Sequence, residues 1–138
     1  MKKKISIVGG GTAALFLASF LDESYFDITI YEKNKALGRK FLVAGDGGFN
    51  LTHSEDLSLF KTRYFPVKFL DEALDGFSNA DMRDWLLKIG IPTFIGSSGR
   101  VFPEKGIKPI QVLKKIEEHL AFKGVVIQHS TSFVDLNT

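Results

Sequence analysis

The chain has 138 residues, of which 44% are hydrophobic and 25% charged, and its formal net charge is +2 at neutral pH. These proportions are ordinary for one globular domain, the interspersed lysines and glutamates argue against a nucleic-acid partner, and no apolar run reaches transmembrane length. The sequence contains no cysteine, which excludes thiol redox catalysis and thiolate metal sites within it and fits a reducing, cytoplasmic location.

A glycine-rich turn, Gly9 to Ala14, lies between two apolar runs near the start of the chain. It reads G-x-G-x-x-A, the turn that joins a buried strand to a helix in a dinucleotide-binding βαβ unit. Gly9 permits the sharp turn, and Gly11 lets the backbone approach a pyrophosphate. The small side chain of Ala14 lets helix and strand pack closely. A phosphate would bind at the helix N-terminus, where N–H groups and the helix dipole favour an anion.

The same N-terminal stretch also resembles a secretory signal peptide, since three lysines precede apolar residues that continue to Leu21. Three consecutive glycines interrupt that apolar run, and no small-residue cleavage site precedes Asp22. We therefore favour a strand over residues 3–8 that is buried on both faces. The helix expected over residues 12–21 is apolar almost all round, so it needs cover on more than one side.

Glu32 ends the second predicted strand, residues 26–32, and lies about 20 residues after the first glycine of the turn. A carboxylate at this spacing binds a ribose hydroxyl in dinucleotide-binding units and repels a 2′-phosphate. The alternative is a solvated glutamate at a strand end. The strand, the glycine turn and the helix together favour a nucleotide without the 2′-phosphate.

Residues 33–55 are polar and rich in glycine, and a loop of this length inside a compact domain is usually functional or disordered. Arg39 and Lys40 offer positive charge to phosphate, and residues 45–48 can present backbone N–H groups without side-chain obstruction. A flexible loop with solvated basic residues explains the same pattern equally well.

The second half of the chain predicts further helices and strands. A short helix is expected over residues 71–74 and a longer one from a cap at Ser78 or Asn79 to Gly90, with Trp85 in the core. A small hairpin follows within residues 93–106. An amphipathic helix then runs from Pro109 to about Lys123 and turns four apolar residues inward: Ile110, Leu113, Ile116 and Leu120.

The last predicted strand, residues 125–129, should lie beside the second strand in a parallel sheet. The N-terminal strand then lacks a neighbour on one side, and a bare edge of this kind invites pairing. We expect a homodimer contact, a strand at Val134 or a companion segment missing from the chain to cover it.

Two longer motifs carry a family resemblance: residues 38–55, GRKFLVAGDGGFNLTHSE, and residues 99–103, GRVFP. Together with the glycine turn they resemble bacterial flavoproteins described as NAD(P)/FAD-dependent or aminoacetone oxidase-like oxidoreductases. The resemblance implies an α/β, Rossmann-like FAD-binding fold of glutathione-reductase type, with a parallel sheet of three or more strands, flanking helices and a small hairpin. It also implies that residues 1–138 are the N-terminal part of an FAD/NAD(P)-binding domain, without the substrate domain and the C-terminal part of the fold.

The resemblance further implies that the chain is the FAD-binding portion of an oxidoreductase that passes hydride through FAD, with NAD(P)H as an electron donor and an unidentified small-molecule substrate. The alternatives are a non-catalytic module that binds ADP, NAD or nothing, and a simple NAD-binding domain. His53 is the one weak catalytic candidate, and no metal site is expected. The residues expected to bind the cofactor are Gly9, Gly11, Thr12, Ala13, Ala14, Glu32, Lys33, Arg39, Lys40, Gly47, Gly48, Asn50, Leu51 and Val134.

Overall fold

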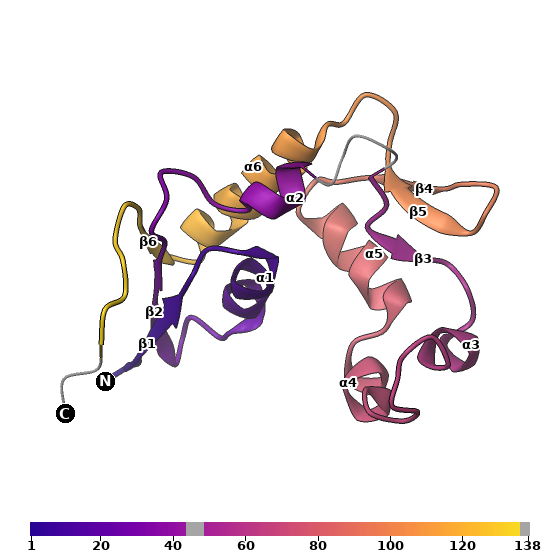
Figure 1. The fold of residues 1–138 in the computed structure, drawn as a ribbon, viewed down its shortest axis with the longest axis horizontal. Helices are drawn as coiled ribbons and strands as arrows, with labels where there is room; N and C mark the ends of the chain where they lie inside the picture. The colour runs from indigo at the N-terminus through magenta and orange to yellow at the C-terminus, as the bar shows by residue number, and fades with distance from the viewer. Residues whose placement is uncertain (44–48, 136–138) are drawn as a thin grey trace. The chain divides into compact units, whose positions relative to one another are not determined.

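The computed structural model describes residues 1–43 and 49–135, and the chain divides into two compact units (Figure 1). The first unit combines Met1–Gly45 with Pro109–Thr138, and the second is Asp46–Lys108. The single domain expected from the composition is therefore built as two units.

The first unit contains a three-stranded parallel sheet in the order β1-β2-β6, as the sequence predicts. Its strands are β1 (Lys3–Val8), β2 (Phe26–Tyr31) and β6 (Val126–Gln128). Ile5 pairs with Ile28, and Ile30 pairs with Ile127. The carboxyl ends of these strands therefore meet at one edge, where ligands bind in open parallel sheets.

Two helices complete the core of this unit, α1 (Thr12–Phe20) and α6 (Pro109–Phe122), and they contact each other. α6 buries Val112, Leu113, Ile116 and Leu120. The prediction for Ile110 is wrong, because its side chain is 54% exposed. Ile110 is the second residue of the helix, and the buried stripe begins two residues later at Val112.

β1 and α1 are more exposed than the sequence predicts. β1 was expected to be buried on both faces, yet Val8 is 58% exposed, and the apolar helix α1 exposes Leu17 and Phe20. No described strand other than β2 pairs with β1. Residues 131–135 form no strand, and Val134 is 91% exposed, so the strand expected there is wrong. The edge of β1 is bare among the described residues.

The polar stretch that follows β2 is more regular than the expected loop. It contains a short helix, α2 (Arg39–Val43), which contacts α6. Gly38 precedes this helix with a φ of 59°, and a Cβ atom there would lie 3.0 Å from a methyl carbon of Leu113. A glycine is therefore required where the chain turns onto α6.

The second unit combines helices with a small antiparallel sheet. The helices are α3 (Leu57–Lys61), α4 (Asp71–Gly76) and α5 (Asn79–Lys88). The predicted hairpin is confirmed as β4 (Thr93–Ile95) and β5 (Arg100–Pro103), and β3 (Thr52–His53) adds a third strand in the order β3-β5-β4. The sequence did not predict α3 or β3.

The N-terminus of α5 ties the helices of this unit to β3. Ser78 and Asp81 form a reciprocal capping box, which confirms the predicted cap. The next residue, Asn79, is buried, and its Nδ2 donates to the carbonyl oxygens of His53 and Glu55 at 2.8 Å each. The Arg63 guanidinium donates to the Glu55 carboxylate at 2.8 Å, and this hydrogen bond from a cation lowers the pKa of Glu55.

Candidate functional site

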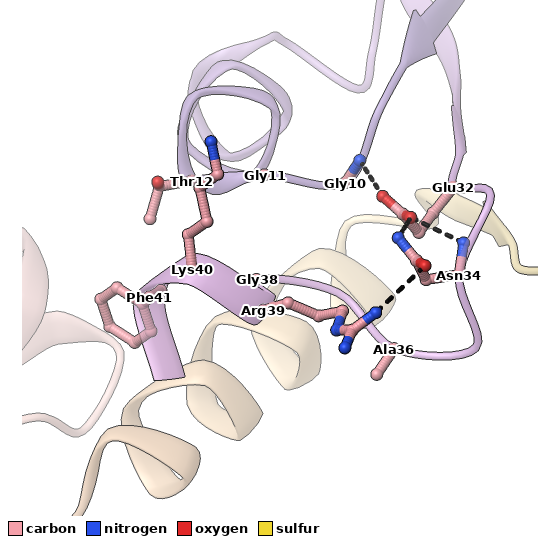
Figure 2. Close-up of a pocket in the computed structure, with 10 residues that line it drawn as sticks. All are labelled: Gly10, Gly11, Thr12, Glu32, Asn34, Ala36, Gly38, Arg39, Lys40 and Phe41. Carbon is pink, nitrogen blue, oxygen red and sulfur yellow. Dashed lines mark hydrogen bonds between the residues drawn. The ribbon is translucent and has the colours of Figure 1, made fainter. Parts of the chain in front are cut away.

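A hollow of about 180 Å³ lies in the first unit, where the glycine turn meets the stretch after β2 (Figure 2). It brings together five residues predicted from the sequence, Gly11, Thr12, Glu32, Arg39 and Lys40. The other residues that line it are Gly10, Asn34, Ala36, Gly38 and Phe41. We call this hollow the glycine-turn site.

The glycine turn leaves the N-terminus of α1 open. Gly9 has a φ of 94°, the left-handed conformation that glycine adopts without strain. Gly11 is the N-cap residue and provides no side-chain cap, so the N–H groups of the first turn have no intrahelical acceptor. A Cβ atom at Gly11 would meet no heavy atom within 4 Å. Backbone donors therefore face open space at the positive end of a helix.

Gly10 is the residue of this turn whose role the sequence analysis missed. A Cβ atom there would lie 2.2 Å from Cδ2 of the buried Leu37 and 3.1 Å from Oε2 of Glu32. The N–H of Gly10 donates to that Oε2 at 2.7 Å, and its carbonyl accepts from the N–H of Gly38 at 2.9 Å. The run of three glycines indicates a turn in the sequence. Only the packing of Leu37 in the structure shows that the middle position cannot hold a larger residue.

Glu32 is not the solvated glutamate of the alternative hypothesis, because it is only 7% exposed. Its Oε1 accepts from the backbone N–H of Asn34 at 2.7 Å and from Asn34 Nδ2 at 2.6 Å. Hydrogen bonds from the N–H groups of Asn34 and Gly10 lower its pKa, so the carboxylate is charged at neutral pH. Three donors use three of about four lone-pair sites, which leaves the carboxylate able to accept once more.

Positive charge comes from the N-terminus of α2. Arg39 and Lys40 are both exposed, and both line the glycine-turn site. Arg39 Nη1 donates to Oδ1 of Asn34 at 3.3 Å, so a chain of hydrogen bonds runs from Arg39 through Asn34 and Glu32 to the N–H of Gly10 (Figure 2). The site thus places one buried anion, two exposed cations and open backbone donors around one hollow.

Several predicted residues do not line this hollow. Asn50 and Leu51 belong to the second unit, where the N–H of Leu51 donates to the carbonyl of Val101 at 2.8 Å. Gly47 and Gly48 lie outside the described residues. The remaining ones are in the first unit, away from the lining: Gly9, Ala13, Ala14, Lys33 and Val134.

His53 is held by protein atoms through both ring nitrogens. Nε2 lies 3.0 Å from the carbonyl oxygen of Ser98, which can only accept, so Nε2 carries a proton. Nδ1 accepts from the N–H of Glu55 at 3.2 Å and lies 3.6 Å from Oε1 of the same residue. This arrangement favours a structural role, in which His53 joins β3 to the turn between β4 and β5.

Within residues 1–43 and 49–135, no group of three acidic or histidine side chains is placed to hold a metal ion. In the same part of the chain, no helix is long and apolar enough to cross a bilayer.

Comparisons with known proteins agree with this geometry. Residues 3–138 match a family described as HI0933-like protein Rossmann domain. The chain is 30% identical over 111 residues to a ribosomal RNA dihydrouridine synthase from Haemophilus influenzae, a match that covers 80% of this chain and 27% of that protein. It is 28% identical over 85 residues to a 4,4'-diaponeurosporene oxygenase from Staphylococcus haemolyticus, covering 62% of this chain and 16% of that protein.

Among solved structures, the fold resembles that of THI4 from Thermovibrio ammonificans. The TM-score is 0.56 at 14% identity, and the match covers 93% of this chain and 38% of the other. The chain therefore spans about a quarter of the length of its H. influenzae relative and less than half of this structural neighbour.

Proposed function

The chain belongs to the HI0933-like family of Rossmann-domain proteins, and from that premise we propose that it is the FAD-binding portion of a flavin-dependent oxidoreductase. The observation that carries the proposal is the pairing of a buried, charged Glu32 with an open helix N-terminus at Gly11. A carboxylate for a ribose and backbone donors for a pyrophosphate are the two contacts that the ADP half of FAD requires. FAD supplies the hydride chemistry when it is bound.

In this proposal, different groups of the glycine-turn site bind the pyrophosphate and the ribose of the ADP half of FAD. The N–H groups at the start of α1 donate to the pyrophosphate, and the absence of a side chain at Gly11 lets it approach. Glu32 accepts from a ribose hydroxyl with its remaining lone pair. Arg39 and Lys40 neutralise phosphate charge. A 2′-phosphate is repelled by the same carboxylate, so the site favours the unphosphorylated ribose.

The remaining predicted contacts are part of the proposal. Lys33, Ala13 and Ala14 flank the pyrophosphate, and the backbone near Val134 contacts the adenine. In this proposal the flavin ring and its ribityl chain contact Gly47, Gly48, Asn50 and Leu51. This assignment rests on the family resemblance of residues 38–55.

We also propose that the chain is the N-terminal part of a longer FAD/NAD(P)-binding protein, in which a companion segment pairs with β1. The short coverage of its relatives supports this, as do the bare edge of β1 and the exposed Leu17 and Phe20 on α1. A homodimer would cover the same edge. Light scattering on the full chain measures its molecular mass and distinguishes these two alternatives. The mass of a dimer would favour the homodimer over a companion segment.

The relatives differ in their named reactions, one a synthase named for ribosomal RNA and one an oxygenase, so their names indicate no common substrate. We propose NAD(P)H as the electron donor of the whole protein. Family membership disfavours the non-catalytic module and the simple NAD-binding domain.

A flavin titration tests this function. The full chain should bind FAD, and Glu32→Ala should weaken binding at least about tenfold because a charge-assisted hydrogen bond to the ribose is lost. Glu72→Ala is the matched control, since Glu72 is an exposed acid in the second unit. Because Glu32 also supports the turn, Gly11→Val provides a second probe, at a position where a Cβ atom meets no heavy atom within 4 Å. Unchanged FAD affinity in both variants would refute the assignment.

A further inference from the structure

A second hollow, of about 370 Å³, lies entirely within the second unit. Its walls come from β3, α3, α4 and α5, which Figure 1 shows gathered in one part of the chain. We call it the aromatic hollow, and the residues that line it are Asn50, Leu51, Thr52, His53, Phe60, Tyr64, Leu74, Phe77, Ser78, Asn79 and Met82.

Its walls offer faces and edges of aromatic rings. Phe60 and Tyr64 meet edge to face, with centroids 5.5 Å apart and an interplanar angle of 74°. Both side chains are half-buried, as are Phe77 and Met82, which also line the hollow. Rings in this state have lost part of their water without being fully packed, so a flat ligand can complete their contacts.

The described residues that line the hollow include no lysine, arginine, aspartate or glutamate. Both ring nitrogens of the histidine in its lining already contact protein atoms, Nε2 the carbonyl oxygen of Ser98 and Nδ1 the backbone N–H of Glu55. The glycine-turn site differs in this respect, because Glu32, Arg39 and Lys40 line it. A charged ligand entering the aromatic hollow would lose hydration without gaining a counter-charge. This disfavours a phosphate or a carboxylate and favours an uncharged ligand.

The polar groups of the hollow fall into two sets. Asn79 and Ser78 are used by the fold, one in bonds to the backbone of residues 53 and 55 and the other in the cap of α5. In contrast, the hydroxyls of Thr52 and Tyr64 and the amide of Asn50 form no hydrogen bond with another described residue. These three groups can donate to and accept from a ligand with an amide-like edge.

We propose that the aromatic hollow binds an uncharged, planar heteroaromatic ring with an amide-type edge, and that this ring belongs to the substrate. A volume near 370 Å³ lies within the range of small-molecule sites. The assignment to the substrate rests on the proposed function, in which Asn50 and Leu51, both in the lining, contact the flavin.

Three probe compounds test the recognised chemistry on the unaltered full chain. α-Pyridone is flat, uncharged and carries an amide edge; δ-valerolactam keeps the edge but is not flat; the carboxylated pyridone is flat but charged. Saturation-transfer NMR titrations should rank α-pyridone first. δ-Valerolactam should bind at least about fivefold more weakly because it cannot stack. The carboxylated pyridone should lose at least about tenfold. Equal binding of the three, or no binding, would overturn the proposal.

Two substitutions locate the probe. Phe60→Leu and Thr52→Val should each weaken α-pyridone binding about fivefold. Phe60→Leu removes an aromatic face, and Thr52→Val replaces a hydroxyl by a methyl group while keeping the shape of the side chain. Phe65→Leu is the matched control, since Phe65 is 91% exposed and outside the lining. Circular dichroism checks that each variant is folded. If Phe65→Leu weakened binding as much as Phe60→Leu, the ring would not occupy this hollow.

FAD titrated into the same samples separates the two proposals. α-Pyridone binding that persists with FAD bound supports a substrate pocket, whereas competition by FAD would assign the hollow to the flavin and overturn this inference. If FAD binds and α-pyridone does not, the proposed function stands and this inference fails. If α-pyridone binds and FAD does not, the proposed function fails and the assignment of the ring to the substrate fails with it.

Discussion

The two hollows differ in what their polar groups do. In the glycine-turn site, Glu32 is charged, buried and already held by Gly10 and Asn34, so its geometry is fixed before any ligand arrives. In the aromatic hollow, no described residue bonds the hydroxyls of Thr52 and Tyr64, and the described lining includes no lysine, arginine, aspartate or glutamate. The first arrangement suits a constant group such as a nucleotide diphosphate. The second suits a ring recognised by shape and a few hydrogen bonds.

The largest expected effect concerns the rigidity of the glycine-turn site. Gly10→Ala should destabilise the protein by about 3 kcal/mol, because the added methyl group meets the buried Leu37 at 2.2 Å. Gly11→Ala is the matched control and should stay within about 0.5 kcal/mol, since its methyl group meets nothing within 4 Å. Urea unfolding of both variants measures the difference. Equal stability would mean that the turn is loosely packed and that the comparison with the aromatic hollow is wrong.

The next effect concerns Asn79, which lines the aromatic hollow. Asn79→Ala should cost about 2 kcal/mol, because two partly buried hydrogen bonds at 2.8 Å to the carbonyls of His53 and Glu55 disappear together. Asn50→Ala removes the same side chain from an exposed position of the same hollow and should change the stability by less than about 0.5 kcal/mol. If thermal unfolding showed the two variants to be equivalent, the division of the polar groups into two sets would not hold.

Glu32→Gln tests the fixed charge and its dependence on pH. The neutral amide leaves one of two backbone N–H donors without an acceptor, so we expect a loss of about 1.5 kcal/mol at pH 7. The pKa of Glu32 is lowered from 4.5, so its contribution is complete above that value and disappears as pH falls through the folded-state pKa. The stability gap between wild type and variant should therefore narrow below about pH 4.5. A gap that widened with acid would contradict the charged state.

The smallest effect concerns the cap of α5. Ser78→Ala removes the side-chain oxygen that accepts from the N–H of Asp81, and caps of this kind contribute about 1 kcal/mol. Ser97→Ala is the control, because Ser97 is exposed, lies in the same unit and is not part of the cap. If urea unfolding gave Ser97→Ala the larger cost, the cap would not contribute to the stability of α5.

The two hollows also differ in how far the sequence predicts them. Gly11, Glu32 and Arg39 converge because a strand, a turn and a helix bring them together over a short stretch of chain, and a local motif reports this. The roles of Gly10 and Asn34 were missed, since they depend on where Leu37 packs and on which donors reach Glu32. The bare outer edge of β1 was foreseen from the strand count, although the strand proposed at Val134 does not form.

The aromatic hollow was not predicted, because its lining comes from four elements spread over residues 50–82 and carries no local motif. α3 and β3 are only five and two residues long, too short to show periodicity. Phe60, Tyr64 and Phe77 read as scattered aromatic residues until tertiary contacts place them together.

The central claim is that the ADP half of FAD binds at the glycine-turn site, and amide NMR shifts of the ¹⁵N-labelled full chain during FAD titration test it most directly. We expect saturating shift changes at Gly10, Gly11, Thr12 and Asn34, with ADP alone reproducing them. FAD-dependent changes that leave these four amides unmoved would contradict the claim.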